Sequence, residues 1–380
     1  MATKGFASPE VLHVYTRTRE LCQQAGETPQ VFQVLRGLWY FYLIRSELRT
    51  ALELGEYLVT LAQQVGDPVL CVEAHYALGL TLNYLGKFAD AQTHLAQGIA
   101  LYNPLQHHTH AVRYGQDPGV GCRAYGAANL WWLGYPEQAL QWSHEAVRLA
   151  RELAHPFTLG FALFLTSWVP QFRREGLLTH ERAEAAIALA AEHGFAVFGA
   201  GGTIFRGWAL AARSIELGPG QEPREEGIAQ IQQGMAAWRA TGAEALRPYY
   251  LALLAEASGK RGQVEEGLHL LAEALAVAKD TGECRWDAEL HRLTGVLLLA
   301  HLRADHAEAE TCFHQALTIA HQQQAKSLEL RAAMSLARLW QGQGKHAEAR
   351  EVLAPIYDWF TAGFDTADLR EAKGLLEALP

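Results

Sequence analysis

The hydrophobic and polar positions of this chain follow a helical spacing, and the pattern is most regular between Ala74 and Tyr102. Apolar side chains occur there in two runs separated by the turn signal Leu85-Gly86-Lys87. The second run steps by three or four residues and consists of Phe88, Ala91, Leu95 and Ile99. Neither helix of such a pair can bury its apolar stripe alone, so the unit must pack against others of its kind.

The same two-helix unit recurs along the chain, each time with a small residue near the middle of its second helix. These central residues are Ala51, Ala91, Ala139, Ala183, Gly227, Gly267, Ala309 and Ala349. Successive centres lie 40 to 48 residues apart, more than the about 34 residues of a standard tetratricopeptide repeat, which uses the same turn and small residue. We expect two helices to approach closely at each centre, where a large side chain would overpack.

The repeats predict an all-α solenoid of about eight tetratricopeptide-like helix pairs, wound into a right-handed superhelix that forms one domain over residues 1–380. A lone helix at 9–25 resembles the second half of a repeat, and a capping helix is expected at 366–379. The helix pairs are predicted at 30–65, 69–102, 120–151, 157–194, 202–240, 247–279, 285–321 and 326–358.

Composition narrows the possible partners and the compartment. The chain has 380 residues, 49% of them hydrophobic, and a formal net charge of −9, so it lacks the basic field that a nucleic-acid partner requires. Its five cysteines are scattered and form no CxxC pair, which suits a reducing compartment. No stretch has the length and apolar character of a membrane span or signal peptide. These features predict a cytoplasmic protein with no membrane partner.

Several longer runs resemble a known family. They are YGQDPGV at 114–120, ELAHP at 152–156, QFRREG at 171–176, RPYYLALLAEA at 247–257 and FTAGFDTADLREAKGLLE at 360–377. They look like the C-terminal tetratricopeptide-like region of large bacterial signalling proteins, where it follows a class III adenylate/guanylate cyclase domain and an AAA-type or STAND-type ATPase module. The resemblance covers essentially the whole chain and implies a sensory or regulatory array that continues from an upstream segment. Neither enzymatic activity is carried over, because this sequence contains neither module.

The chain also lacks the common signatures of cofactor and metal sites. Gly86-Lys87 is not followed by the Ser or Thr of a P-loop, and Gly199–Gly202 follows a helical pattern, which favours a helix break over a phosphate cradle. The imidazoles of His107, His108 and His110 have no fixed helical spacing, so a polar loop is favoured over a metal site. We therefore expect no catalytic residue, no cofactor and no metal.

The longest spacing between repeats falls at the connector Asn103–Gly121, which is rich in His, Pro and Gly. Long connectors inside compact arrays are functional or disordered more often than not, and the turn residues of this one favour order. Two interpretations stay open. The connector either folds over the concave face as part of a recognition site, or it fills a gap between two offset repeats.

Ten tryptophans and thirteen tyrosines are concentrated in the first helices of the repeats, which line the concave face in helical arrays. Most large rings are expected to pack between helices, and the remainder, with nearby arginines, would form a groove suited to an acidic peptide or a C-terminal carboxylate. The candidate groove residues are Tyr76, Tyr114, Gln116, Asp117, Arg123, Tyr125, Trp168, Arg206, Trp208, Arg247 and Tyr249.

The sequence thus predicts a non-catalytic array that binds a protein or peptide partner in its concave groove, as the sensory or scaffold part of a bacterial cyclase or ATPase signalling protein. The partner could include other modules of its own parent protein. The alternative is a sensor that binds a small metabolite in the same groove, since a solenoid is a scaffold that fixes no chemistry by itself.

Overall fold

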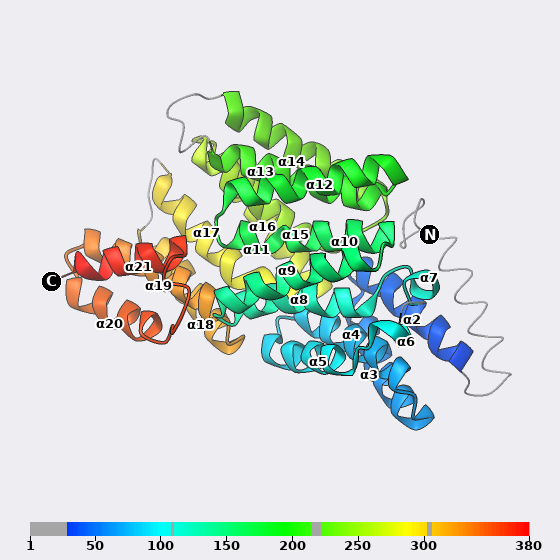
Figure 1. The fold of residues 1–380 in the computed structure, drawn as a ribbon. Coiled ribbons are helices and arrows are strands. Elements are labelled where there is room, and N and C mark those ends of the chain that lie inside the picture. Colours follow the sequence, from blue (N-terminus) through cyan, green and yellow to red (C-terminus); the bar gives the residue numbers. More distant parts are fainter. Residues whose placement is uncertain (1–28, 108–109, 214–221, 302–305, 380) are drawn as a thin grey trace.

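The computed structural model describes residues 29–107, 110–213, 222–301 and 306–379, and these form an all-α solenoid of consecutive helix pairs (Figure 1). The predicted helix at 9–25 lies outside the described residues. Each helix packs against its neighbours along the chain, so the apolar stripes that no single pair could bury are covered by the next repeat.

In repeats one to four, the first helix of each pair is α2 (Pro29–Ile44), α4 (Pro68–Tyr84), α8 (Pro118–Trp132) and the interrupted α10 (Pro156–Thr166) with α11 (Trp168–Phe172). In repeats five to eight it is α13 (Ala196–Arg213), α15 (Arg247–Lys260), α17 (Asp287–Ala300) and α19 (Lys326–Gly342). Their partners are α3 (Leu48–Val65), α5 (Phe88–Leu101), α9 (Pro136–Glu152), α12 (Gly176–His193), α14 (Glu222–Ala240), α16 (Val264–Thr281), α18 (His306–Gln322) and α20 (His346–Tyr357). The short helices α6 (Pro104–His107), α7 (His110–Tyr114) and η1 (Cys284–Trp286) lie between pairs, and α21 (Ala367–Glu377) covers the last pair.

Helix ends follow from local sequence. Several first helices begin with a proline at the first position, and the carboxylates of Asp67 and Asp117 accept hydrogen bonds from the backbone N–H groups of Val69 and Val120. The turn inside the second repeat favours Gly86, whose φ of 71° is a left-handed conformation that other residues rarely adopt. The turns of the first and fourth repeats have the same conformation at Ser46 and Arg174, so the backbone shape is shared even where glycine is absent.

The small residue at each repeat centre is buried, as the close approach of paired helices requires. Ala91 and Ala349 have no exposed surface, and a Cβ built on Gly267 would lie 3.1 Å from the backbone carbonyl oxygen of Ala255 in the partner helix α15. The glycines Gly199–Gly202 serve the same purpose. They lie inside α13, so their interpretation as a helix break is wrong; a Cβ on Gly201 would lie 2.2 Å from the ring of Phe164.

One first helix is interrupted. The helix of the fourth repeat stops after Thr166 and resumes at Trp168 because Pro170 has no N–H to donate to the carbonyl of Thr166. The hydroxyls of Thr166 and Ser167 bond back to carbonyls one turn earlier, at Ala162 and Leu163. The break turns the last part of this helix, which carries Gln171 and Phe172, into a separate short segment.

The two halves of the array pack against each other along a seam that the repeat pattern did not indicate. The turns inside repeats one to four contact, in order, the junctions that follow repeats five, six, seven and eight, and Figure 1 shows the later helices α15 to α17 behind the earlier ones. The Ile44 carbonyl accepts hydrogen bonds from the N–H groups of Glu244 and Ala245, both at 3.0 Å. Asn83 accepts one from Arg285 at 3.0 Å, and the Trp131 carbonyl accepts one from the Ser327 hydroxyl.

The seam has a buried ion pair at its middle. The Arg285 guanidinium donates two hydrogen bonds to Glu283, and it stacks over the ring of Tyr84 with its central carbon 3.6 Å from the ring centroid. Glu283 also accepts hydrogen bonds from the Ser46 hydroxyl and the Leu246 N–H. Arg285 and Glu283 are both fully buried, so the seam excludes water from the charges that join repeats one and two to repeat seven.

No helix among the described residues combines the length and apolar character that a membrane crossing requires.

Candidate functional site

The first helices of repeats five to eight enclose a cavity of about 930 Å³. Helices α13, α15, α17 and α19 form its walls, the Phe172–Gly176 turn closes one side, and α21 closes another. The cavity lies on the face that the repeat pattern predicts to be concave, but only in the second half of the array.

One wall of the cavity is apolar and aromatic. Trp208 and Tyr249 face it together with Trp286, whose ring is stacked on that of Tyr249 with centroids 4.1 Å apart and planes inclined by 5°. Further apolar residues of α15, α17 and α18 continue this wall, namely Ala252, Leu253, Leu293, Val296, Leu297 and Phe313. The wall can hold an apolar body by burial of its surface, about 25 cal/mol for each Å² removed from water.

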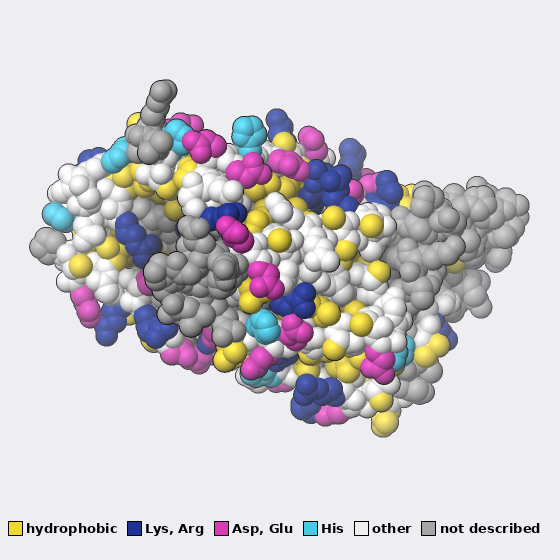
Figure 2. Space-filling model, turned by 90° about the horizontal axis from the view of Figure 1, so that it is seen from above, with side chains coloured by type: hydrophobic (Ala, Val, Ile, Leu, Met, Phe, Trp, Pro, Cys, Tyr) yellow, Lys and Arg dark blue, Asp and Glu magenta, His cyan; other side chains and the backbone are white. Residues whose placement is uncertain are grey.

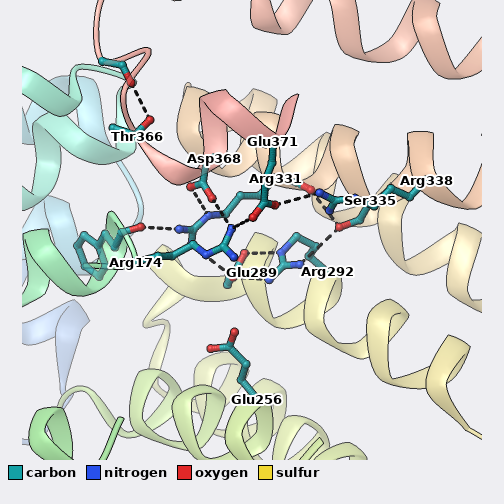
Figure 3. Close-up of polar contacts among 12 residues, drawn as sticks. Arg174, Glu256, Glu289, Arg292, Arg331, Ser335, Arg338, Thr366, Asp368 and Glu371 are labelled. Atoms are coloured by element: carbon teal, nitrogen blue, oxygen red, sulfur yellow. Dashed lines mark hydrogen bonds and ion pairs between the residues drawn. The ribbon is translucent and has the colours of Figure 1, made fainter. Parts of the chain in front are cut away.

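The opposite side carries an ion-pair network that joins four elements (Figure 3). At its centre, Arg331 of α19 donates to Asp368 of α21 at 2.8 Å and lies 3.6 Å from Glu289 of α17. A further nitrogen of Arg331 donates to the Phe172 carbonyl. Glu289 forms a two-point pair with Arg292, at 2.7 and 2.8 Å. These four charged side chains are 11 to 16% exposed, so they are largely screened from bulk water.

Toward the opening of the cavity the charges become more exposed. Glu371 of α21 accepts from Arg174 at 2.6 Å and from Arg338 at 2.9 Å, and Arg174 also lies 3.4 Å from Asp368. Arg174 and Arg338 are 45 and 48% exposed. Burial alone would raise the pKa of Glu371, but Arg174 and Arg338 outweigh it and lower that pKa. Two carboxylates of α21 are thus paired with three arginines.

Glu256 extends the network toward the apolar wall. Figure 3 shows it reaching from α15 toward Glu289 and Arg331, with no dashed contact to the residues drawn. Its carboxylate accepts from Lys260 at 2.7 Å. Burial would raise the pKa of Glu256, and the charge of Lys260, supported by Arg292 and Arg331, lowers it to about 2. The cavity therefore contains an ionised carboxylate, that of Glu256, beside the arginines of the ion-pair network.

Four of the aromatic candidates from the sequence are brought together, but in the interior. The rings of Tyr76, Tyr125, Trp168 and Tyr249 form a chain with successive centroid distances of 6.4, 5.6 and 6.3 Å. Each ring is at most 3% exposed. The second half of the array covers the concave face of repeats one to four and buries these rings. Tyr76, Tyr125 and Trp168 therefore have no surface on the cavity. Among the candidates, Trp208 and Tyr249 line it.

The connector candidates pack inward. The Gln116 amide donates to the Tyr76 hydroxyl at 2.7 Å, and Asp117 caps α8 while accepting from the Tyr102 hydroxyl at 2.9 Å. Burial raises the pKa of Asp117 to about 6, although its hydrogen bonds with Val120 and Tyr102 oppose this rise. Gln116 and Asp117 are buried, as the gap-filling interpretation of 103–121 expects, whereas Leu105 and Val112 of the same connector are 85 and 82% exposed.

A buried ion-pair cluster ties the connector to the first repeats. His110 of α7 lies 2.8 Å from Glu73, which also accepts from Arg36 at 2.9 Å, and none of the three is more than 2% exposed. Burial would raise the pKa of Glu73, and Arg36 and His110 outweigh it and lower that pKa. Tyr114 packs beside this cluster, with its ring 5.2 Å from that of His110.

The arginine candidates lie away from the cavity. Arg123 donates to the Gly119 carbonyl and lies 3.9 Å from Glu145. Arg206 pairs with Glu184 and with Gln230, and Arg247 pairs with Glu273 at 2.7 Å. Each of the three arginines bonds to its own helix or to a second helix next to it. They strengthen contacts between neighbouring helices and do not converge on one ligand.

The charged residues that do converge were not among the sequence candidates. They are Arg174, Arg292, Arg331, Arg338, Glu256, Glu289, Asp368 and Glu371. One signal could have indicated part of this set: arginines at 331 and 338 stand two turns apart on one face of the first helix of the eighth repeat. Their carboxylate partners on α21 could not be found this way, because only the seam and the cap bring them together.

No group of three or more metal-binding side chains occurs among the residues that the structure describes. The side chains of His107 and His108 fall outside this part, so the predicted polar character of their loop is not tested. His110 itself is committed to Glu73.

Comparison with known proteins supports the fold and leaves the family open. No family model matches the chain. An uncharacterised protein of Rhizobium meliloti (strain 1021) is 24% identical over 344 residues, which are 89% of this chain and 32% of that protein. The chain therefore spans about a third of the length of the curated relative that it matches.

Solved structures with the same arrangement of helices include tetratricopeptide-like regulators. A Rap protein complexed with competence and sporulation factor aligns with a TM-score of 0.55 at 14% identity, over 89% of this chain and 81% of that one. The Rap conjugation gene regulator of plasmid pLS20, in complex with the Phr* peptide, aligns with a TM-score of 0.53 at 10% identity, over 92 and 98%. A human IFIT1 dimer with PPP-AAAA aligns at 0.54 with 12% identity, over 97 and 78%. At these identities the likeness establishes the helical-repeat fold alone.

Proposed function

We propose that this chain is a non-catalytic regulatory array that binds a peptide in the cavity of repeats five to eight. The observation that carries the proposal is the pairing, within one cavity of about 930 Å³, of an aromatic and aliphatic wall with a row of arginines. The wall suits apolar side chains of a peptide, and guanidinium groups bind carboxylates through paired N–H donors. Of the groove residues that the sequence suggested, this proposal keeps Trp208 and Tyr249. The arginines of the cavity take the anion-binding role that was expected of Arg123, Arg206 and Arg247.

Two comparisons support a peptide. The Rap protein with competence and sporulation factor and the Rap regulator with the Phr* peptide share this fold, and the second of these ligands is a peptide by name. A nucleic acid is disfavoured by the formal net charge of −9, and Figure 2 shows acidic and basic side chains interspersed on the visible face without a broad basic field.

The setting we propose is a longer signalling protein, because the chain spans about a third of its Rhizobium meliloti relative and resembles arrays that accompany cyclase or ATPase modules. In such a protein the array would sense the peptide and transmit its occupancy to the attached modules. Ligand binding can bias such modules only if it favours one conformation of the array over another.

A cavity-blocking variant tests the proposal. Peptides selected from a random display library on the wild-type chain are measured by calorimetry against Val296→Trp, which places an indole in the cavity, and against Val65→Trp on α3. Val296 and Val65 are 37 and 40% exposed, so the control position matches the test position in exposure and differs in lying outside the cavity. We expect the selected peptides to lose at least about tenfold in affinity, or 1.4 kcal/mol, for V296W alone. Equal binding by all three proteins would refute the site.

The second candidate is a small metabolite. The cavity volume lies within the range of about 300 to 1,000 Å³ that is typical of small-molecule sites, and this observation favours it specifically. Thermal denaturation with metabolite mixtures distinguishes the two, because a ligand at a hundred times its dissociation constant adds about 2.7 kcal/mol of stability. A metabolite shift that V296W abolishes, without any selectable peptide, would favour the metabolite.

A further inference from the structure

The capping helix does more than cover the last repeat. Its apolar face, with Leu369, Ala372 and Leu375, is buried against α19 and α20, as expected for a cap. Asp368 and Glu371, at the edge of this apolar face, point into the cavity (Figure 3). A cap needs only the apolar face, so the two carboxylates in the cavity require a separate reason.

The two carboxylates occupy the arginines in the manner of a ligand. Asp368 bonds to Arg331 at 2.8 Å and lies 3.4 Å from Arg174, while Glu371 bridges Arg174 at 2.6 Å and Arg338 at 2.9 Å. The arginines come from α19 and from the turn before α12, so guanidinium groups of two separate elements converge on the same two carboxylates. Bound oxyanions in proteins are held by such converging guanidinium groups.

The contacts are graded so that an incoming anion would meet the exposed ones first. Arg174, Arg338 and Glu371 are 38 to 48% exposed, whereas Arg331 and Asp368 are each 13% exposed. The exposed contacts of Glu371 with Arg174 and Arg338 are weak, so another anion can readily take the place of Glu371. The deeper pair of Asp368 with Arg331 holds α21 until these outer contacts are broken.

We infer that Arg174, Arg331 and Arg338 form an oxyanion-binding site that α21 fills with its own carboxylates, and that a ligand's carboxylate or phosphate displaces Asp368 and Glu371 and loosens the cap. The inference deepens the proposed function, since it assigns the anionic end of the ligand and the element that responds to it. The apolar contacts of α21 remain after displacement, so the helix loosens on its base and does not leave the array.

Removal of the internal carboxylates tests the site. Calorimetry with citrate and with inorganic phosphate compares the wild-type chain with Asp368→Asn/Glu371→Gln. The matched control is Glu377→Gln, which neutralises a 67% exposed carboxylate of the same helix. If Asp368 and Glu371 leave the three arginines free in about a tenth of the wild-type molecules, the double variant should bind a probe about tenfold more tightly than the wild type and E377Q. The tighter of the two probes identifies the oxyanion. Unchanged or weaker binding of both would overturn the inference.

A second measurement needs no variant and covers the case in which the double variant unfolds. Hydrogen exchange of the wild-type chain is followed with and without saturating citrate or phosphate. We expect the amides of α21 to exchange several-fold faster with the bound probe, while those of α5, at the other end of the array, keep their rates. Binding of the probe without faster exchange in α21 would refute the inference that a bound anion loosens this helix. This result would leave the peptide test with V296W unaffected, so the two proposals can fail separately.

Discussion

The seam between the two halves of the array makes a sharp prediction about Arg285. Replacing it with methionine keeps much of the side-chain volume but leaves the buried carboxylate of Glu283 without its counter-charge. The Ser46 hydroxyl and the Leu246 N–H would still donate to that carboxylate, at 3.4 and 3.1 Å, but both donors are neutral. The variant therefore isolates the charge that joins repeat seven to repeats one and two.

The magnitude follows from the burial of both partners. Removing one member of a buried ion pair costs about 3 to 5 kcal/mol, and loss of the donor to Asn83 adds about 1 kcal/mol. We expect Arg285→Met to lower the free energy of unfolding by about 4 to 6 kcal/mol. The double variant with Glu283→Gln should recover at least half of this loss, because no buried charge remains.

Urea unfolding followed by tryptophan fluorescence measures the loss, and small-angle scattering measures whether the seam opens and enlarges the radius of gyration. Arg148→Met is the control, since its pair with Glu152 is exposed and worth less than about 1 kcal/mol. Burial raises the pKa of Glu283, although Arg285 opposes it. Without Arg285 the pKa of Glu283 rises further, so R285M gains more stability than the wild type as the pH falls, and its penalty should shrink with falling pH. A penalty below about 1 kcal/mol, or a double variant as unstable as the single one, would refute the seam argument.

Three further predictions concern packing and buried charge. Ala91→Leu should lower unfolding free energy by about 1 to 3 kcal/mol in urea denaturation, because its site is fully buried, whereas Ala96→Leu on the exposed face of the same helix should change it little. Glu73→Gln should cost about 3 to 5 kcal/mol by the same assay, since it leaves buried Arg36 without a counter-charge; a neutral result would contradict the pairing. Asp117→Asn keeps the helix cap but removes a carboxyl whose pKa is about 6 in the folded state. Relative to this variant, the wild type should gain about 1 to 3 kcal/mol as the pH falls from about 7 to about 4, and parallel stability curves would exclude the raised pKa.

Several buried and partly buried groups also change the stability of the wild type with pH, and they act in opposite directions. Asp117 and Asp287, with pKa values of about 6, stabilise the fold as the pH falls. Burial lowers the pKa of His75, and of other partly buried histidines such as His155 and His291, so these groups take up protons more readily in the unfolded chain and oppose that trend. The two effects overlap in the same pH range, and only a difference between matched proteins separates them.

The sequence by itself determined the repeat. Helical spacing, the turn glycine at Gly86 and the small residues such as Ala91 are local requirements of one helix pair, and each can be recognised within about 40 residues of chain. The fold class and the eight helix pairs followed from them. The aromatic residues of the first helices were also recognised as one group, because their spacing places them on a common face.

Only the tertiary structure decided which part of that face is open. The turns of repeats one to four meet junctions about 200 residues later, for example Asn83 with Arg285 and Trp131 with Ser327. No local pattern encodes these contacts, because repeats of this kind can wind loosely or tightly with the same helix pairs. The tight winding buries Tyr76, Tyr125 and Trp168 and leaves the cavity to repeats five to eight. It also brings Arg174 to α21, a contact between residues nearly 200 positions apart that makes the charged side of the site.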